Sequence, residues 1–244
     1  MTRFFAFCGA FFLYALAIVR SFLSLPLYFV EIMKQVYFIG NRSLGLTSFS
    51  GLSIGVVLAL QTIGILQKFG AVSYVATVVS LSIVKELGPV ITALMVAGRA
   101  GSGVCAQIGS MKVTRQVAAM QIMNVDPIRF LLRTRVLAFI ISTPVLTLMA
   151  ILVGNIGGMA IAVSVGNIST LEYMNKVMDF VTLADILEAV VKSLCFGLLI
   201  GLVSTYLGYT VQGGTREVGI KTTDTVVISS MLIFFFDILI TKVF

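Results

Sequence analysis

The sequence lacks histidine and has few charged residues. None of its 244 residues is histidine, which removes the commonest metal ligand and the commonest general base. Charged residues make up 11% of the chain, whereas soluble domains carry about 25%. Hydrophobic residues make up 59%, and the mean hydropathy is +1.09. Apolar runs long enough to cross a bilayer, without the alternation of a membrane β-barrel, therefore predict an all-α polytopic membrane protein.

Cysteines are few, and neither internal repeats nor a cleavable signal are visible. Cys8, Cys105 and Cys195 lie far apart and form no CxxC pair, so we expect them to act as small apolar residues. The N-terminal apolar run is not followed by a cleavage site of the A-x-A type, which predicts no cleaved signal peptide. The lack of a repeat argues against a secondary transporter built from inverted repeats.

Five apolar runs predict five transmembrane helices, preceded by a separate segment over residues 1–44. The predicted spans are Leu46–Leu66, Ser73–Ala97, Val136–Val163, Ile186–Val211 and Thr225–Leu239, of which the last is the shortest. Residues 45–244 would thus form the membrane domain. Residues 4–30 are also apolar, but Arg20 interrupts them and Pro26 predicts a break. They either span the membrane or lie in its interface as an amphipathic element.

The charge distribution predicts the orientation. The loop 99–135 carries six basic residues and a single acid, Asp126, so the positive-inside rule places it in the cytoplasm. The loop 164–185 carries three acids and one lysine and should lie outside. Five spans then leave the C-terminus outside. The net charge of +7 is explained by basic cytoplasmic loops and predicts no nucleic-acid partner.

A lysine–glutamate pair interrupts the second predicted span, Ser73–Ala97. Lys85 and Glu86 are its only charged residues, and an ionised group near the bilayer centre costs about 2.5–3.5 kcal/mol on insertion scales. Gly88 and Pro89 follow at once. Because Pro89 has no N–H for the carbonyl of Lys85, the helix should kink there. These four residues are the candidate substrate-binding site. The alternative is a structural pair that reaches to water at a helix end.

Asp237 is a further acid inside a predicted span. It could pair with Lys85 or with a neighbouring subunit. Glu86 and Asp237 could also serve as proton sites in a proton- or ion-coupled carrier, which is the alternative function. An intramembrane enzyme is disfavoured, because the chain has no histidine and no carboxylates paired at helical spacing in a span were found. We therefore predict no catalytic residues and no metal site.

The stretch GGTREVGIKT (residues 213–222) resembles a phosphate-binding loop only superficially. Ile220 separates Gly219 from Lys221, so the required Gly-Lys-Ser/Thr sequence is broken. We expect a tight cytoplasmic turn here. If ATP drives this protein, another chain must bind it.

The basic loop contains the pattern of an amphipathic helix. An apolar stripe is formed by Val113, Val117 and Met120 at positions i, i+4 and i+7. The polar residues lying mostly off this stripe are Lys112, Arg115 and Gln116. The helix should end by Asp126 and Pro127, because a residue before proline avoids the α conformation. Such a helix is a docking element for another protein, or alternatively a helix on anionic lipid headgroups.

Glycines at helical spacing predict close helix packing. The spacings are Gly51–Gly55 and Gly197–Gly201, with a cluster at Gly154, Gly157 and Gly158. These faces should pack helices within the subunit or across a dimer.

Three successive parts of the sequence together resemble the MlaE-type permease family: the stretch ELGPVITALMVAGRAGSGVCAQIGSMKV, the NVDP after it, and the next span. The C-terminal stretch Gly219–Asp237 resembles it as well. These permeases are membrane subunits of ABC systems that move lipids with an MCE-domain partner. The resemblance implies a homodimer with a phospholipid cavity between subunits, ATP bound by a separate ATPase chain, no cofactor in this chain, an interfacial N-terminal helix and a bacterial inner-membrane location.

The resemblance also assigns residues. The glutamate of the family's ELGP motif falls on Glu86, with Lys85 where the family often has a basic residue. The ATPase-coupling helix falls on Gln107 to Asp126. Gln107 and Arg115 stand where acids are frequent in the family, and Thr134 stands where proline is usual. The coupling loop is thus more basic than expected, which puts the identity of the ATPase partner in doubt more than the fold.

Overall fold

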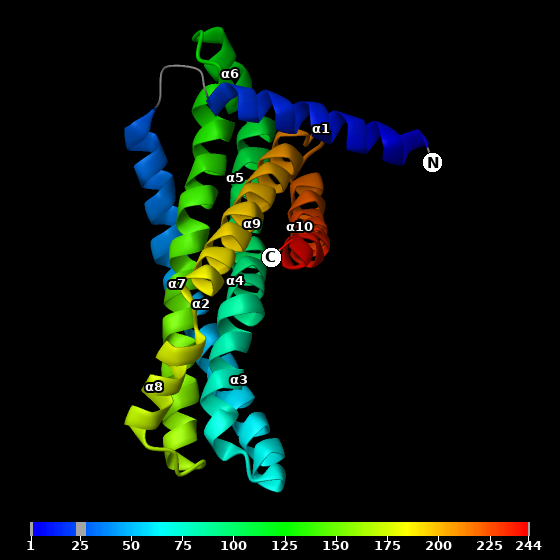
Figure 1. Cartoon of the computed structure of the whole chain (residues 1–244). Helices are drawn as coiled ribbons and strands as arrows, with labels where there is room; N and C mark the ends of the chain where they lie inside the picture. The colour runs from blue at the N-terminus through cyan, green and yellow to red at the C-terminus, as the bar shows by residue number, and fades with distance from the viewer. Residues whose placement is uncertain (1, 23–27, 244) are drawn as a thin grey trace.

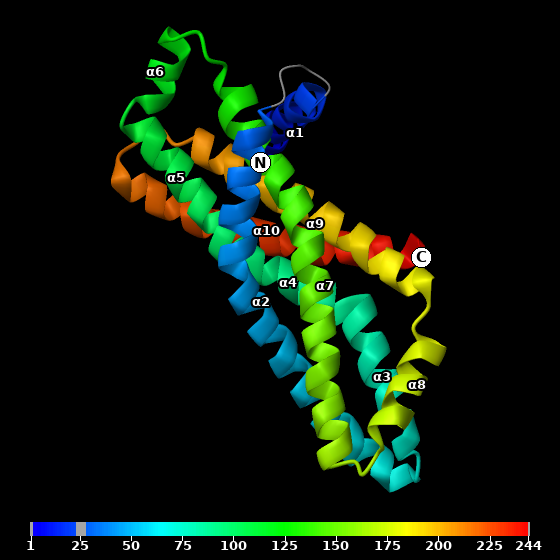
Figure 2. The same ribbon diagram turned by 90° about the vertical axis from the view of Figure 1, so that its left-hand side faces the viewer.

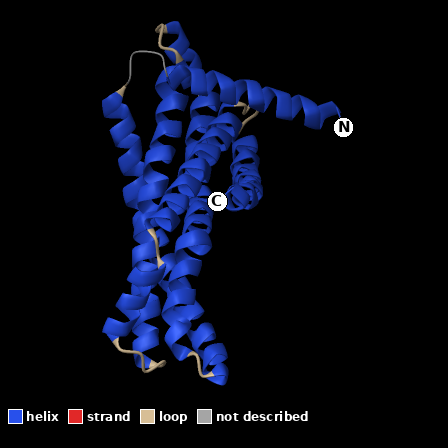
Figure 3. Ribbon diagram, in the orientation of Figure 1, coloured by secondary structure: helices blue, strands red, loops and turns tan. Residues whose placement is uncertain are grey.

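The protein is an all-helical bundle, seen in a computed structural model that describes residues 2–22 and 28–243 and side chains from residue 9 onward. No strand occurs in this described part (Figure 3). Five of its helical segments are long and apolar enough to cross a membrane: Phe29–Phe69, Val72–Val113, Ile128–Ser164, Leu183–Tyr209 and Thr215–Val243. The predicted fold class and the number of spans are therefore confirmed.

The second span is one helix interrupted by two wider turns. It begins with the 3₁₀ turn η2 (Val72–Tyr74) after η1 (Gln67–Phe69) closes the first span. Its parts are α3 (Val75–Ser82), the π-helical turn η3 (Ile83–Leu87), α4 (Gly88–Val96), the π-helical turn η4 (Ala97–Gly101) and α5 (Ser102–Val113). Single π-helical turns inside α-helices are frequent at functional sites. The first of them coincides with the lysine–glutamate pair.

The first span is longer than predicted. Helix α2 runs from Phe29 to Leu66, so it begins well before the expected start at Leu46 and includes the last part of the predicted segment 1–44. The helix crosses the polar residues Asn41 and Arg42 without a break. Hydropathy marks the part of a helix that faces lipid, whereas the helix itself continues into the interface.

Other helices also extend beyond the predicted spans. Helix α5 continues into the predicted basic loop 99–135 as far as Val113, and the π-helical turn η5 (Ile128–Leu132), followed by α7 (Arg133–Ser164), begins inside it. The fifth span was predicted as the shortest, yet α10 runs over Thr215–Val243. The turn expected at residues 213–222 is therefore confined to its first residues.

Helix α1 (Thr2–Phe22) lies across the end of the bundle. It runs nearly perpendicular to the long helices in Figure 1 and is seen almost end-on in Figure 2. One side packs on α9 (Leu183–Tyr209), where the Tyr14 hydroxyl donates to Thr205 Oγ1 at 2.9 Å. Phe12 and Leu13 remain exposed. This arrangement fits an interfacial helix rather than a sixth span. The predicted break at Pro26 lies outside the described residues.

Glycine packing holds α2 against α7, and the two helices run side by side in Figures 1 and 2. A Cβ atom at Gly51 would lie 2.5 Å from the carbonyl oxygen of Ala150, and one at Gly55 would overlap the carbonyl oxygen of Gly154. The predicted glycine faces therefore pack helices within the subunit. Helices α9 and α10 run together at an incline to this pair (Figure 2).

Candidate functional site

The KELGPV stretch forms the π-helical turn η3 and the start of α4. The Gly88 N–H donates to the carbonyl of Ile83, five residues back, instead of four. Gly88 is required by space, because a Cβ there would lie 2.6 Å from Ile151 Cγ1 on α7. The predicted irregularity at Pro89 is thus a widened turn just before the proline. The charged pair at this turn contacts α9 and α10.

The carbonyl of Lys85, four residues before Pro89, accepts a hydrogen bond from a lysine of another helix. The Nζ of Lys192, on α9, donates to the carbonyl oxygen of Lys85 at 2.9 Å. The Lys192 side chain is fully buried. A buried ammonium needs compensating acceptors, and this carbonyl supplies one of them. This bond joins the fourth span to the second at the turn before Pro89.

Three carboxylates surround the same ammonium group. The Lys192 Nζ lies 2.8 Å from Glu86 Oε1, 3.3 Å from Glu188 Oε1 and 3.5 Å from Asp237 Oδ1. These acids come from the second, fourth and fifth spans. The hydroxyl of Thr241 also donates to Glu86 Oε1, at 3.2 Å. The ammonium group of Lys192 therefore forms ion pairs with residues of three spans.

Lys85 makes a second set of ion pairs with the start of α9. Its Nζ lies 2.7 Å from Asp185 Oδ1 and 3.8 Å from Glu188 Oε2. Asp185 also caps α9, because its Oδ2 accepts from the N–H and the hydroxyl of Thr182, each at 2.8 Å. Glu188 bridges the two lysines. We call these six residues the charge network: Lys85, Glu86, Asp185, Glu188, Lys192 and Asp237.

The charge network is mostly buried and carries more acids than bases. Its two lysines and four carboxylates give a formal charge of −2. Glu86 and Lys85 are exposed by 40% and 43%, whereas the other four side chains are exposed by 17% or less. The network is therefore accessible mainly at Glu86 and Lys85.

The network corrects two statements made from the sequence. Asp237 pairs with Lys192 and not with Lys85. Carboxylates at helical spacing do exist, since Asp185 and Glu188 lie three residues apart on α9, but lysines engage both. Sequence reasoning missed Asp185, Glu188 and Lys192 as site residues. Their spacing of i, i+3 and i+7 on one helical face was the signal that could have found them.

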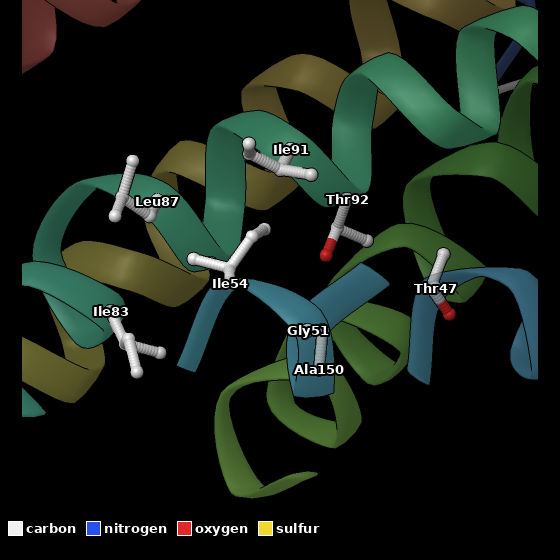
Figure 4. Close-up of a pocket in the computed structure, with 9 residues that line it drawn as sticks. Thr47, Gly51, Ile54, Ile83, Leu87, Ile91, Thr92 and Ala150 are labelled. Atoms are coloured by element: carbon white, nitrogen blue, oxygen red, sulfur yellow. The ribbon is translucent and has the colours of Figure 1, made fainter. Parts of the chain in front are cut away.

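An apolar groove lies near the same turn, on the side of α2. It consists of two adjoining hollows that share Ile54 and Leu87. The inner one, beside Gly88, has a volume of only about 10 Å³, and the outer one is a shallow, open hollow of about 300 Å³. Figure 4 shows Ile54 of α2 pointing toward the part of the second span that carries Leu87 and Ile91. The groove is lined by Thr47, Gly51, Ser53, Ile54, Val57, Leu58, Gln61, Ile83, Leu87, Gly88, Ile91, Thr92 and Ala150. We call it the α2 groove.

The four predicted substrate-binding residues occupy three different environments. Lys85 and Glu86 belong to the charge network, and Gly88 lines the α2 groove. Pro89 is buried and lines neither pocket. Leu87, between Glu86 and Gly88 in the chain, lines the groove. The turn therefore joins a charged site to an apolar groove.

The predicted coupling helix is broken into two pieces. Helix α5 ends at Val113, and α6 covers Gln116–Ile122. Between them, Arg115 has a φ of 60°, in the left-handed region. The prediction of one continuous helix carrying Val113, Val117 and Met120 is therefore wrong. A residue in the left-handed conformation ends one helix, and the next helix starts in a new direction.

The predicted coupling residues nevertheless gather at one end of the bundle. Lys112 places its ammonium 4.2 Å from the centroid of the Tyr209 ring, and Val117 is buried. Asp126 accepts from the Ile128 N–H at 2.9 Å and pairs with Arg129 at 3.3 Å. Arg115 and Gln116 are exposed, while Val113 and Met120 are half-buried.

Two apolar side chains project from this end as well. Ile122 is 86% exposed and Met123 is 67% exposed. Ile122 is the last residue of α6 and Met123 follows it. Helix α6 lies at the tip of the bundle in Figures 1 and 2. We call residues 114–127 the α6 tip. Exposed apolar residues on a basic loop are typical of a surface that meets another protein.

Known proteins resemble this chain over nearly its whole length. The sequence model of the family described as "Permease MlaE" matches residues 32–243. A "Probable ABC transporter permease protein" of Rickettsia typhi is 39% identical over 234 residues, covering 96% of this chain and 90% of that protein. The "Intermembrane phospholipid transport system permease protein MlaE" of Haemophilus influenzae is 35% identical, covering 88% and 83%. The chloroplastic protein Trigalactosyldiacylglycerol 1 of Arabidopsis thaliana is 33% identical, covering 87% and 61%.

Proposed function

Because the chain belongs to the MlaE permease family, we propose that it is the membrane subunit through which an ABC transporter moves phospholipid. The resemblance seen in the motifs is confirmed by the family match, and the chain is a permease of the ABC type. The phospholipid substrate is supported by the H. influenzae relative, whose name states phospholipid transport. The observation that carries the proposal is the charge network joined to the α2 groove at one turn.

A phospholipid needs two kinds of surface at once. Its acyl chains require an apolar surface, and its headgroup requires polar partners. The α2 groove supplies the first, and the exposed parts of Lys85 and Glu86 supply the second, with Leu87 between them. We assign Lys85 and Glu86 to the headgroup. Gly88 and Pro89 hold the widened turn that presents them.

The energy comes from a partner chain in this proposal. The sequence has no intact phosphate-binding loop, so a separate ATPase binds ATP and docks on the α6 tip. ATP binding and hydrolysis there shift the permease between two states that differ in their affinity for lipid. We place the α6 tip in the cytoplasm, the C-terminus outside, and the chain in a bacterial inner membrane. A homodimer with an MCE-domain partner completes the assembly.

The first experiment is native mass spectrometry of the tagged protein, gently extracted from its own membrane. The expected assembly contains two copies of this chain, two ATPase chains and bound phospholipid. Homo-oligomers without ATPase or lipid contradict the proposal. In that case a carrier using Glu86 and Asp237 becomes the better explanation, and transport driven by a pH gradient alone would support it.

The second experiment tests the site in proteoliposomes that contain the co-purified assembly. A hydrogen bond to a charged group contributes about 1.5–3 kcal/mol, so Glu86→Gln should lower ATP-dependent phospholipid transfer about tenfold or more. The matched control is Glu172→Gln, at an exposed acid on α8 (Thr170–Phe180), away from the charge network. If Glu86→Gln and Lys85→Met both transport like the control, the headgroup assignment is wrong.

A further inference from the structure

Helix α8 connects the third and fourth spans and presents three distinct faces. It begins at Ser169, whose hydroxyl accepts the Glu172 N–H at 3.1 Å. Tyr173 is buried, and Val177 packs with it against the hydrophobic core formed by α2, α3 and α7. Figures 1 and 2 place α8 beside α3 and α7, at the end of the bundle opposite the α6 tip.

One flank of α8 is apolar and uncovered. Leu171, Met174 and Met178 occupy positions i, i+3 and i+7, so they form one stripe along the helix. They are 72%, 49% and 71% exposed. We call these three residues the apolar flank. It borders the buried face on one side.

The other flank of α8 is polar. Glu172, Asn175 and Asp179 follow the same helical spacing on the far side of the apolar flank, and all three are exposed. The only lysine of the helix, Lys176, lies over the rings of Tyr74 and Phe180, at 5.2 and 5.7 Å from their centroids. The helix thus separates apolar from charged residues on its solvent side.

The elements that α8 touches and joins also expose apolar residues. On α7 the side chains of Ile156 and Val163 are 57% and 36% exposed. The first turns of α9 expose Leu183 and Leu187 by 81% and 61%. Tyr74, 53% exposed, adds an aromatic ring of the kind enriched at membrane interfaces. The helices next to α8 therefore also expose apolar side chains of a kind suited to lipid.

A protein partner fits the apolar flank less well. A stable interface covers about 800 Å² on each side and uses 20–30 residues, and its strongest contacts come from Trp, Tyr and Arg. The flank offers three Leu and Met side chains. A helix with a charged face and a separate apolar face instead has the pattern of an interfacial membrane helix.

We propose that α8 is an interfacial membrane helix, with Leu171, Met174 and Met178 inserted among lipid acyl chains and Glu172, Asn175 and Asp179 in water. This assignment does not depend on the transported substrate or on an ATPase. It gives the end of the bundle opposite the α6 tip a fixed depth in the bilayer.

The chain contains no tryptophan, so a single introduced tryptophan reports its own surroundings. We would reconstitute Met178→Trp and, as the matched control, Asn175→Trp in phosphatidylcholine vesicles, with and without brominated acyl chains. Met178→Trp should emit at shorter wavelength and be quenched by the brominated lipid. Asn175→Trp should be quenched by aqueous iodide instead.

The proposal is overturned if iodide quenches both tryptophans equally and brominated lipid quenches neither. It is also overturned if Met178→Trp is shielded from iodide only in the assembly extracted with its partner proteins, because a protein would then cover the flank. Should Met178→Trp fail to fold, as judged by gel filtration, Leu171→Trp gives the same measurement on the same flank.

Discussion

Replacing Lys192 by methionine removes the cation on which three spans converge. The change keeps the length of the side chain but leaves the carboxylates of Glu86, Glu188 and Asp237 without their shared ammonium. It also removes the hydrogen bond that Lys192 donates to the carbonyl of Lys85. We expect a large loss of stability.

The magnitude follows from burial. Removing one partner of a buried ion pair costs about 3–5 kcal/mol, and Lys192 is fully buried, so solvent does not screen it. Glu188 and Asp237 are exposed by only 8% and 17%, so their charges stay largely buried, whereas Glu86 is 40% exposed. At roughly 2–4 °C per kcal/mol for a chain of this size, the midpoint of thermal unfolding should fall by about 6–20 °C.

The assay is thermal unfolding in detergent, followed by circular dichroism. Lys34→Met is the control, because Lys34 pairs with Glu31 at 3.6 Å but is 68% exposed, and exposed pairs contribute about 0–1 kcal/mol. Combining Lys192→Met with Glu188→Gln and Asp237→Asn removes the uncompensated charges and should recover part of the loss. The reasoning is refuted if Lys192→Met melts like Lys34→Met, or if the triple variant melts below the single one.

Three further predictions use the same measurement. Gly55→Ala places a Cβ on the carbonyl of Gly154 and should destabilise by about 1–3 kcal/mol, whereas Gly45→Ala, with open space around it, should stabilise the helix by up to about 1 kcal/mol. Equal shifts for the two glycines would show that the α2–α7 contact is not tight. Arg115→Gly relieves a left-handed backbone and should raise stability by about 1 kcal/mol, so a lower melting temperature would mean that the guanidinium makes a stabilising contact. Tyr173→Phe removes a buried hydroxyl that has no hydrogen-bond partner among the described residues, so unfolding should shift by less than about 1 kcal/mol or toward higher stability, and a large loss would reveal a bound water or partner.

Some features of the site were predictable because they are local. A lysine–glutamate pair in an apolar run is costly in lipid, so Lys85 and Glu86 could be selected without knowing their neighbours. Pro89 removes one hydrogen bond wherever it stands, which predicted an irregular turn at that place. The break at Arg115 was not predictable, because nothing in the residue pattern of 112–120 distinguishes a left-handed arginine from a helical one.

The sequence by itself determined the spans, the family motifs and the isolated intramembrane charges. Hydropathy and the absent N–H of a proline depend only on residues that are neighbours in the chain. Only the tertiary structure decided which charges meet. Lys192 stands 107 positions from the carbonyl it serves, and Asp237 reaches it from a third helix. Helix crossings set by glycine contacts bring them together, and the burial that results makes their pairing obligatory.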